Sequence, residues 1–283
     1  MFLHLVKETA SMKYGLIFLL LCCATDSFGT AQVPDFLIYK GDTLSIFSNP
    51  LEASFSEEKE RKIPSLGCES TACWRGYVAW WELRNDSLFL IKIEGCCKNE
   101  NAVYQTLDLE FLFGEAVVNK AVFANWVSFT LPHPYGKLLR YEHSGYASLY
   151  AYEQYFHFEQ GILQKIEQFD NTKTKESLYA TNHDSLLHFL YNTIRWEDLP
   201  PLKDSERKRV IVGFKTDSLG KAIKIVVRRG INPIYDQEAV RVVQQIPAWS
   251  VYYKRGKMVS MSWHLPITFD QKRYLMSLDL EEK

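Results

Sequence analysis

The sequence lacks the short motifs that identify several large enzyme classes. It contains no G-x-S-x-G, no H-E-x-x-H, no P-loop and no G-x-G-x-x-G, the motifs of serine hydrolases, zinc proteases, nucleotide hydrolases and dinucleotide-binding enzymes. Its net charge is only −1, which gives no reason to expect a nucleic-acid partner. Past the N-terminal leader, no segment approaches the ~18 apolar residues of a membrane-spanning helix. We therefore expect a protein that is not an enzyme, holds no cofactor or metal, and has no membrane span in its mature form.

Apolar and aromatic side chains, in contrast, are abundant. Hydrophobic residues make up 47% of the 283 residues and aromatic residues 14%. This apolar content is enough to build a core and argues against disorder. The aromatic enrichment favours β-structure, because aromatic side chains fit a pleated, half-buried surface.

The N-terminus has the pattern of a secretory signal peptide. Lys13 supplies a positive charge, and residues 15–24 form an apolar run of signal-peptide length. Gly29 and Ala31 stand at the −3 and −1 positions of a cleavage site before Gln32. The sequence therefore predicts an exported, periplasmic protein whose signal peptide covers residues 1–31.

A lipoprotein anchor is the alternative to a cleaved signal peptide. Cys22 and Cys23 lie in the right region for lipidation. A lipobox needs a small residue before the cysteine, whereas Leu21 and Cys22 occupy those positions. The pattern therefore favours cleavage over lipidation.

Four cysteines follow the leader: Cys68, Cys73, Cys96 and Cys97. Cysteines of an exported protein form disulfides more often than metal sites, and C-x4-C followed by an adjacent pair is not a zinc-ribbon spacing. Adjacent cysteines rarely bond each other, because the ring is strained. We predict two disulfides between the Cys68/Cys73 segment and the Cys96/Cys97 turn, with free thiols and a metal site as the alternatives.

Charge and pattern divide the mature chain in two. Residues 32–182 carry 14 basic and 20 acidic residues, and residues 183–283 carry 17 and 12. This asymmetry predicts a domain of unknown function over residues 32–180, a second domain over residues 183–270, and a C-terminal tail over residues 271–283.

The first part is predicted to be antiparallel β. Residues 77–83 and 87–93 alternate on either side of a polar turn, and residues 154–158 and 162–169 repeat this arrangement around Gln160-Gly161. Trp74, Trp80 and Trp81 lie near the cysteines. They are interpreted as core around the disulfides, with a carbohydrate or peptide platform as the alternative.

The second part alternates between helix and strand. Residues 184–196 have helical spacing, residues 210–216 and 222–229 flank a hairpin turn, and residues 258–269 form a last long strand. Asn232 and Pro233 are an N-cap and an N1 proline that begin a helix over residues 233–245. The order α-β-β-α-β predicts an α+β fold class for this domain, after a β-rich first domain.

These elements resemble the C-terminal domain family of TonB. The matching segments are VIVGFKTDSLGKAIKIVVRRG from Val210, NPIYDQEAVRVVQQIPAW from Asn232, and WHLPITF from Trp263. The resemblance covers about a third of the chain. The membrane anchor and proline-rich stretch of TonB are not seen, and RWEDLPPLK replaces the tyrosine-proline motif that usually closes the first helix. The resemblance therefore implies the fold but not the energy-transducing role.

The resemblance also implies a binding mode. TonB-like domains take up a peptide of an outer-membrane receptor on an exposed sheet edge, through backbone pairing. The implied partner is a protein or peptide, and the implied context is TonB-dependent outer-membrane transport. The corresponding edge strand here would comprise Met258, Val259, Ser260, Met261, Ser262, Trp263, His264 and Leu265.

Two further patterns leave alternatives open. A basic rim of Arg228, Arg229, Lys254, Arg255 and Lys257 is either a solvated surface or a docking site for an acidic partner or for the acidic first domain. The alternative function is an enzyme or carbohydrate-binding activity in the first domain, which a deep pocket with convergent polar groups would support.

Overall fold

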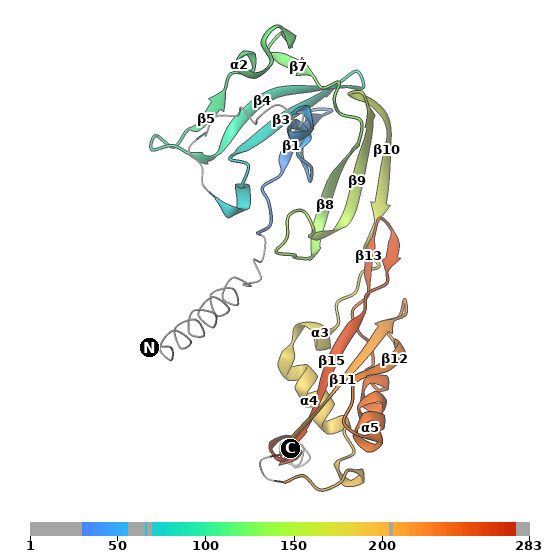
Figure 1. Cartoon of the computed structure of the whole chain (residues 1–283). Coiled ribbons are helices and arrows are strands. Elements are labelled where there is room, and N and C mark those ends of the chain that lie inside the picture. Colours follow the sequence, from blue (N-terminus) through green and yellow to red (C-terminus); the bar gives the residue numbers. More distant parts are fainter. Residues whose placement is uncertain (1–29, 56–65, 67–69, 204–205, 276–283) are drawn as a thin grey trace, which may run out of the picture.

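The computed structural model describes residues 30–55, 66, 70–203 and 206–275 and has a mixed α+β fold that is mostly β-sheet (Figure 1). The predicted α+β class is confirmed. The predicted signal peptide and Cys68 lie outside the described residues, apart from Thr30 and Ala31 of the leader. Figure 1 shows a strand-rich lobe formed by the earlier elements and a second lobe formed by α3 to α5 with the last strands.

The first lobe is a ten-stranded, strongly curved sheet. Its strand order is β2-β1-β3-β4-β10-β9-β8, with β5 and β7 on β4 and β6 on β7. The pair β1–β3 is parallel and the other pairs are antiparallel. The strands are β1 (Asp35–Tyr39), β2 (Asp42–Ile46), β3 (Tyr77–Arg84), β4 (Ser87–Lys98), β5 (Tyr104–Leu107), β6 (Val117–Val118), β7 (Ala121–Phe123), β8 (Thr130–Arg140), β9 (Leu149–Glu159) and β10 (Ile162–Asp170). The lobe also has helix α2 (Leu109–Phe113) and the short 3-10 turns η1 (Pro50–Ser54), η2 (Thr71–Cys73) and η3 (Gly114–Ala116).

The two ends of this sheet approach each other. The backbone N–H of Phe47, just after β2, donates to the carbonyl of Pro132 in β8 at 2.7 Å. A ring nitrogen of His133 lies 2.9 Å from the carbonyl of Ser45. The sheet thus curls toward a barrel around fully buried side chains such as Trp81 and Phe156.

Both predicted hairpins of this lobe are present, and their turns explain why. Asn85 and Asp86 both have positive φ, and so do Gln160 and Gly161. Two consecutive residues of this conformation form the turn whose twist matches paired antiparallel strands. Asn, Asp and Gly adopt it at low cost, so the turn chemistry of the sequence sets the register of β3–β4 and β9–β10.

The second lobe is a three-stranded sheet in the order β12-β11-β15 with helices packed on one face. Asn182 caps α4 through Ser185 at 2.9 Å, and Asn232 caps α5 through Ile234 and Tyr235. The elements are α3 (Leu178–Thr181), α4 (His183–Thr193), η4 (Trp196–Asp198), β11 (Arg207–Thr216), β12 (Ala222–Arg229), α5 (Pro233–Gln244), β13 (Tyr252–Lys254), β14 (Lys257–Val259) and β15 (Trp263–Asp270).

The sequence predicts one continuous strand over residues 258–269, and this prediction is wrong. Met258 and Val259 belong to β14, which pairs with β13 in a separate two-stranded hairpin. Residues 260–262 have no strand conformation, and β15 starts at Trp263. Arg255 and Gly256 have positive φ, so they close the hairpin turn. The apolar alternation of the sequence does not reveal this division, because both pieces have strand-like composition.

Buried apolar residues form two separate clusters, one within residues 37–158 and the other within residues 190–269. The segment before the predicted domain start at residue 183 nevertheless contacts the second lobe. Lys175 and Val251 exchange two backbone hydrogen bonds of 2.9 Å, and the Ser177 hydroxyl donates to the carbonyl of Ala248 at 2.7 Å. The second lobe therefore begins at about Thr174.

We expect a fragment of residues 174–275 to fold alone and to be more stable than one of residues 183–275. The shorter fragment loses the Lys175–Val251 pairing and the Ser177 contacts, and each hydrogen bond contributes roughly 0.5–1.5 kcal/mol. The expected difference in the free energy of unfolding is thus about 2 kcal/mol. Urea denaturation followed by circular dichroism measures it. Identical midpoints, or an unfolded longer fragment, would contradict this boundary.

Candidate functional site

The candidate site is the outer edge of β15. This strand pairs with β11 from Trp263 to Asp270, and no other strand in the described part of the chain pairs with it. The inward-facing side chains of Leu265, Ile267 and Phe269 are almost completely buried. The strand is therefore firmly anchored by its side chains while its far backbone edge has no partner strand among the described residues.

Pro266 indicates which backbone groups face that edge. Proline has no N–H, so within a sheet it is tolerated where its nitrogen points away from the neighbouring strand. Backbone groups alternate in direction along a strand. The N–H groups of His264 and Thr268, and the carbonyls of His264, Pro266 and Thr268, are thus assigned to the outer edge. An incoming strand would pair with these groups.

A groove of about 320 Å³ follows this edge. One wall consists of apolar α4 side chains, and the other contains Arg207 and Arg209 from the opposite face of β11. The edge strand lies between them, because Leu265, Pro266, Ile267 and Thr268 also line the groove. The α4 wall consists of Leu186, Leu187, Leu190 and Tyr191, with His183 at its beginning and Ile194 just after its end. The groove therefore provides an apolar surface for the side chains of a bound segment. This surface lies beside the outer backbone edge of β15, which has no partner strand among the described residues.

The opposite edge of the same sheet is less suitable for strand addition. Lys224 in β12 has positive φ, and the β11–β12 register shifts twice. Irregular backbone and exposed cations such as Arg228 protect sheet edges from pairing. The two edges of this sheet thus differ: β15 lacks one outward donor at Pro266, but its pairing with β11 shows no register shift.

The structure separates the predicted basic rim into two places. Arg228 and Arg229 lie on β12, whereas Lys254, Arg255 and Lys257 lie at the β13–β14 hairpin. The hairpin turn is seated on the first lobe, so the five residues do not form one continuous surface.

Arg255 contacts the first lobe through its backbone and its side chain. Its backbone N–H donates to the carboxylate of Glu153 at 2.8 Å, its Nε donates to the Tyr155 hydroxyl at 3.0 Å, and its guanidinium lies over the Tyr155 ring. Asn171, fully buried, donates to Glu153 and accepts from the N–H of Gly256. Arg255 thus docks on the acidic first domain, which was one of the alternatives inferred from the sequence. No pattern in the sequence indicates that Glu153 and Asn171 take part in this contact.

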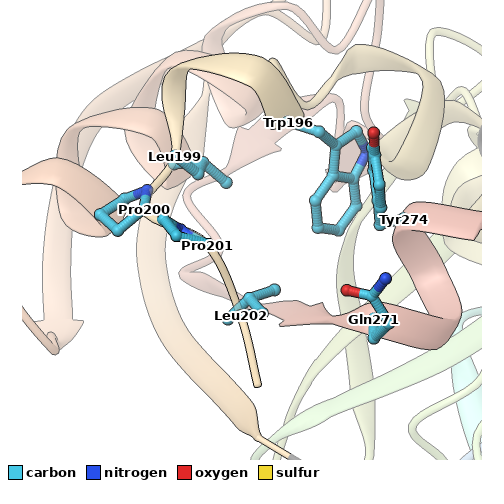
Figure 2. Close-up of a pocket in the computed structure, with 7 residues that line it drawn as sticks. All are labelled: Trp196, Leu199, Pro200, Pro201, Leu202, Gln271 and Tyr274. Atoms are coloured by element: carbon cyan, nitrogen blue, oxygen red, sulfur yellow. The ribbon is translucent and has the colours of Figure 1, made fainter. Parts of the chain in front are cut away.

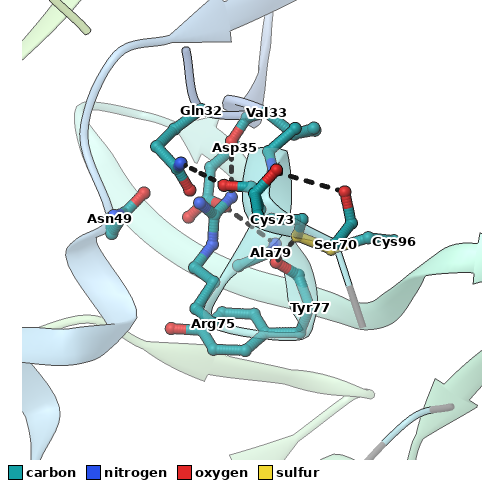
Figure 3. The surroundings of a disulfide bond; sticks show 12 residues. Gln32, Val33, Asp35, Asn49, Ser70, Cys73, Arg75, Tyr77, Ala79 and Cys96 are labelled. Carbon is teal, nitrogen blue, oxygen red and sulfur yellow. Dashed lines mark hydrogen bonds and ion pairs between the residues drawn. A yellow bond between two sulfur atoms is a disulfide. The ribbon is translucent and has the colours of Figure 1, made fainter. Parts of the chain in front are cut away.

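The predicted disulfide region contains a bond between Cys73 and Cys96 (Figure 3). Their Cα atoms are 6.4 Å apart, and Cys73 is buried. Cys97 is also disulfide-bonded. The bond joins η2 to the end of β4, next to a buried ion pair.

That ion pair is formed by Asp35 and Arg75 (Figure 3), whose side chains are both fully buried. The Asp35 carboxylate accepts from Arg75 at 2.9 Å, from the backbone N–H of Ala79 at 3.1 Å and from Trp81 Nε1 at 3.2 Å. Burial raises the pKa of Asp35 to about 6, against the opposing charge of Arg75. These contacts connect the start of β1 to β3, so we assign the ion pair a structural role.

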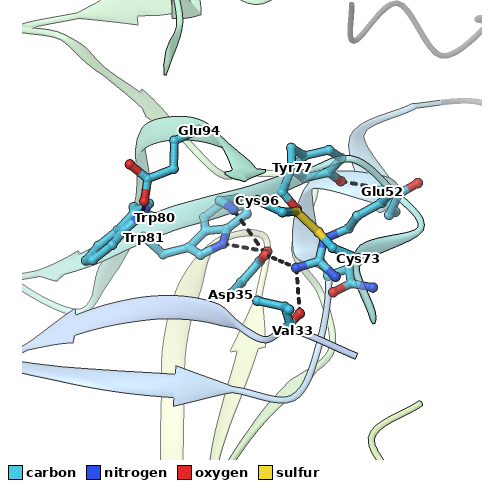
Figure 4. A network of polar contacts seen from close by, with 12 residues as sticks. Val33, Asp35, Glu52, Cys73, Tyr77, Trp80, Trp81, Glu94 and Cys96 are labelled. Carbon is cyan, nitrogen blue, oxygen red and sulfur yellow. Dashed lines mark hydrogen bonds and ion pairs between the residues drawn. A yellow bond between two sulfur atoms is a disulfide. The ribbon is translucent and has the colours of Figure 1, made fainter. Parts of the chain in front are cut away.

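The tryptophans near the cysteines have different environments. Trp81 is fully buried in the core, as interpreted from the sequence. Trp80 donates to Glu94 at 2.6 Å (Figure 4). Its ring also lies under the ammonium group of Lys92. Trp74 is 62% exposed. The three side chains therefore do not form one flat platform.

Five pockets lie in the second lobe, between residues 178 and 274. One of about 350 Å³ is lined by Trp196, the Leu199–Leu202 loop, Gln271 and Tyr274 (Figure 2). Its lining is mainly apolar. Within the described ranges, no group of three or more His, Cys, Asp or Glu side chains is placed to hold a metal ion. No helix there is long and apolar enough to cross a membrane.

Comparisons with known proteins found no matching family model, no similar curated protein and no similar solved structure. Function is therefore inferred from the residues of this chain and their geometry.

Proposed function

We propose that this chain is an exported, non-enzymatic protein that captures an extended segment of a partner protein by strand addition to β15. The observation that carries the proposal is the pairing of β15 on one side only among the described residues, with an apolar groove along its other side. Backbone pairing supplies affinity in this binding mode, and pockets for alternate side chains supply specificity. The resemblance to TonB C-terminal domains supports the same edge and suggests a partner in the outer membrane.

The core supports this role by holding the strand in place. Leu265, Ile267 and Phe269 pack into the same cluster as Val210 and Tyr235. A preformed edge needs little reordering on binding, which reduces the entropic cost of capture. The edge can therefore bind a flexible segment without rearranging its own lobe.

The test replaces one outward donor. The full chain from Gln32 onward is used to select binders from a phage-displayed library of random dodecapeptides. We expect His264→Pro to abolish binding of the selected peptides, because it removes an outward N–H and blocks the ladder. His264→Ala is the matched control, since it removes the same exposed side chain but keeps the N–H, and it should bind within about twofold of the unsubstituted protein.

Ser260 and Ser262, which the sequence placed in the expected edge strand, lie outside the strand, so the test uses His264. Circular dichroism and thermal melting of both variants verify the fold. The proposal fails if no peptide is selected, or if correctly folded His264→Pro binds as well as His264→Ala.

A further inference from the structure

Cations gather on the open face of the second sheet, next to the groove. Arg209 in β11 and Arg229 in β12 are both exposed, and neither has an ion pair or hydrogen-bond partner among the described residues. Together with Arg207, Lys208, Gly230 and Ile231 they line a hollow of about 520 Å³. We call Arg207, Arg209 and Arg229 the arginine face.

Local acids do not neutralise this face. Asp270 lies 3.9 Å from Arg207 but also pairs with Arg273. Asp236 uses its carboxylate to accept the backbone N–H of Ile231 at 2.8 Å. Glu206 pairs with Lys208 rather than with an arginine of the face. Arg209 and Arg229 are thus the cations of this surface with no counterion in the described part of the chain.

The arginine face is continuous with the groove along β15. Arg207 and Arg209 line both the hollow and the groove. Arg209 is in register with Thr268, and Arg207 with Asp270. If a strand of a partner were added to β15, the half of that strand that pairs near Thr268 would lie beside this positive charge.

We propose that the partner segment captured at β15 is an acidic peptide, with Asp or Glu side chains beside the arginine face and apolar side chains in the α4 groove. This inference rests on the proposed strand addition. A peptide fits better than another polyanion because the site combines a backbone edge and an apolar wall with the charge. Arginine suits this task, since its planar guanidinium binds carboxylates through two parallel hydrogen bonds.

The test uses the same peptide library. Peptides selected by the unsubstituted chain are expected to be enriched in Asp and Glu at one end, and their affinity should fall as salt is raised. The double variant Arg209→Glu/Arg229→Glu should bind those peptides about tenfold more weakly at low salt. Selected against the library anew, it should lose the acidic preference or prefer Lys and Arg. A single-stranded oligonucleotide and vesicles containing anionic lipid are added as competitors.

The control changes net charge by the same amount elsewhere. Lys137→Glu/Lys173→Glu alters two exposed cations away from the arginine face and should keep both affinity and preference. Absence of acidic enrichment, or an unchanged preference in the folded arginine variant, overturns the inference while strand addition stands. Stronger displacement by the oligonucleotide or the vesicles than by an acidic peptide also overturns it. If no peptide binds, the proposed function fails and this inference with it.

Discussion

Arg75→Met is expected to lower the free energy of unfolding by about 3–5 kcal/mol at pH 7.5, because it leaves a buried carboxylate without its counterion. Asp35 and Arg75 are both fully buried, and Arg75 also donates to the carbonyl of Val33 at 2.8 Å and to the Tyr146 hydroxyl at 3.2 Å. Removal of the guanidinium therefore affects three partners at once. Chemical denaturation of the full chain from Gln32 onward measures the loss.

The effect should depend on pH in a defined direction. Folding already raises the pKa of Asp35 from 3.8 to about 6, with Arg75 lowering it. Without Arg75 the folded-state pKa of this carboxyl rises further, so protonation can remove the unpaired charge. The destabilisation relative to the unsubstituted protein should therefore be smaller near pH 5 and should grow as pH rises above about 6. A loss independent of pH would indicate that packing, rather than charge, is responsible.

Two variants isolate the charge. In Arg75→Met/Asp35→Asn the buried charge is absent, and the amide oxygen can still accept from Ala79 or Trp81, so part of the lost stability should return. Arg84→Met breaks a largely exposed pair with Glu82, which is expected to cost no more than about 1 kcal/mol. If Arg75→Met and Arg84→Met are equally mild, the buried pair does not have the structural importance assigned to it.

Removal of the Cys73–Cys96 disulfide is expected to cost about 3 kcal/mol. The two cysteines are separated by 23 positions, and closing a loop of this size restricts the unfolded chain by roughly that amount. Cys73→Ala/Cys96→Ala should therefore lower the denaturation midpoint under non-reducing conditions. Under reducing conditions the unsubstituted protein should approach the variant, apart from any effect of other disulfides.

A thiol titration checks the premise of this prediction. The unreduced, denatured protein lacking residues 1–31 should show no free cysteine. The double alanine variant should likewise show none, because the other two cysteines are predicted to be bonded. Four free thiols would contradict the disulfide assignment, and a variant as stable as its parent would contradict the stated energy.

Several local structures follow from the sequence alone. The turn residues Asn85 and Asp86 predict a hairpin, and Asn232 with Pro233 predicts the start of α5. Such signals are readable because each depends on a few neighbouring residues and on their own backbone preferences. Alternating apolar side chains likewise predict the strands that form the two cores.

Other features were decided by tertiary structure. The parallel pairing of β1 with β3 and the Asp35–Arg75 contact join segments about 40 residues apart, and the Arg255–Glu153 contact joins segments 102 positions apart. Contacts between distant segments leave no periodic signal in the sequence. The division of the predicted last strand has the same origin, since its first part forms the hairpin that docks on the first lobe.

The candidate site shows most clearly which features come from the local sequence and which from the tertiary structure. The sequence by itself determined that β15 would be an apolar strand with a proline, because composition and alternation are local properties. Only the tertiary structure decided that this strand has a partner strand on one side alone among the described residues, and that α4 forms a groove beside it. It also brought Arg207 and Arg209 of the next strand to the same groove. These relations depend on strand order and helix packing, which arise when separate segments bury their apolar faces together.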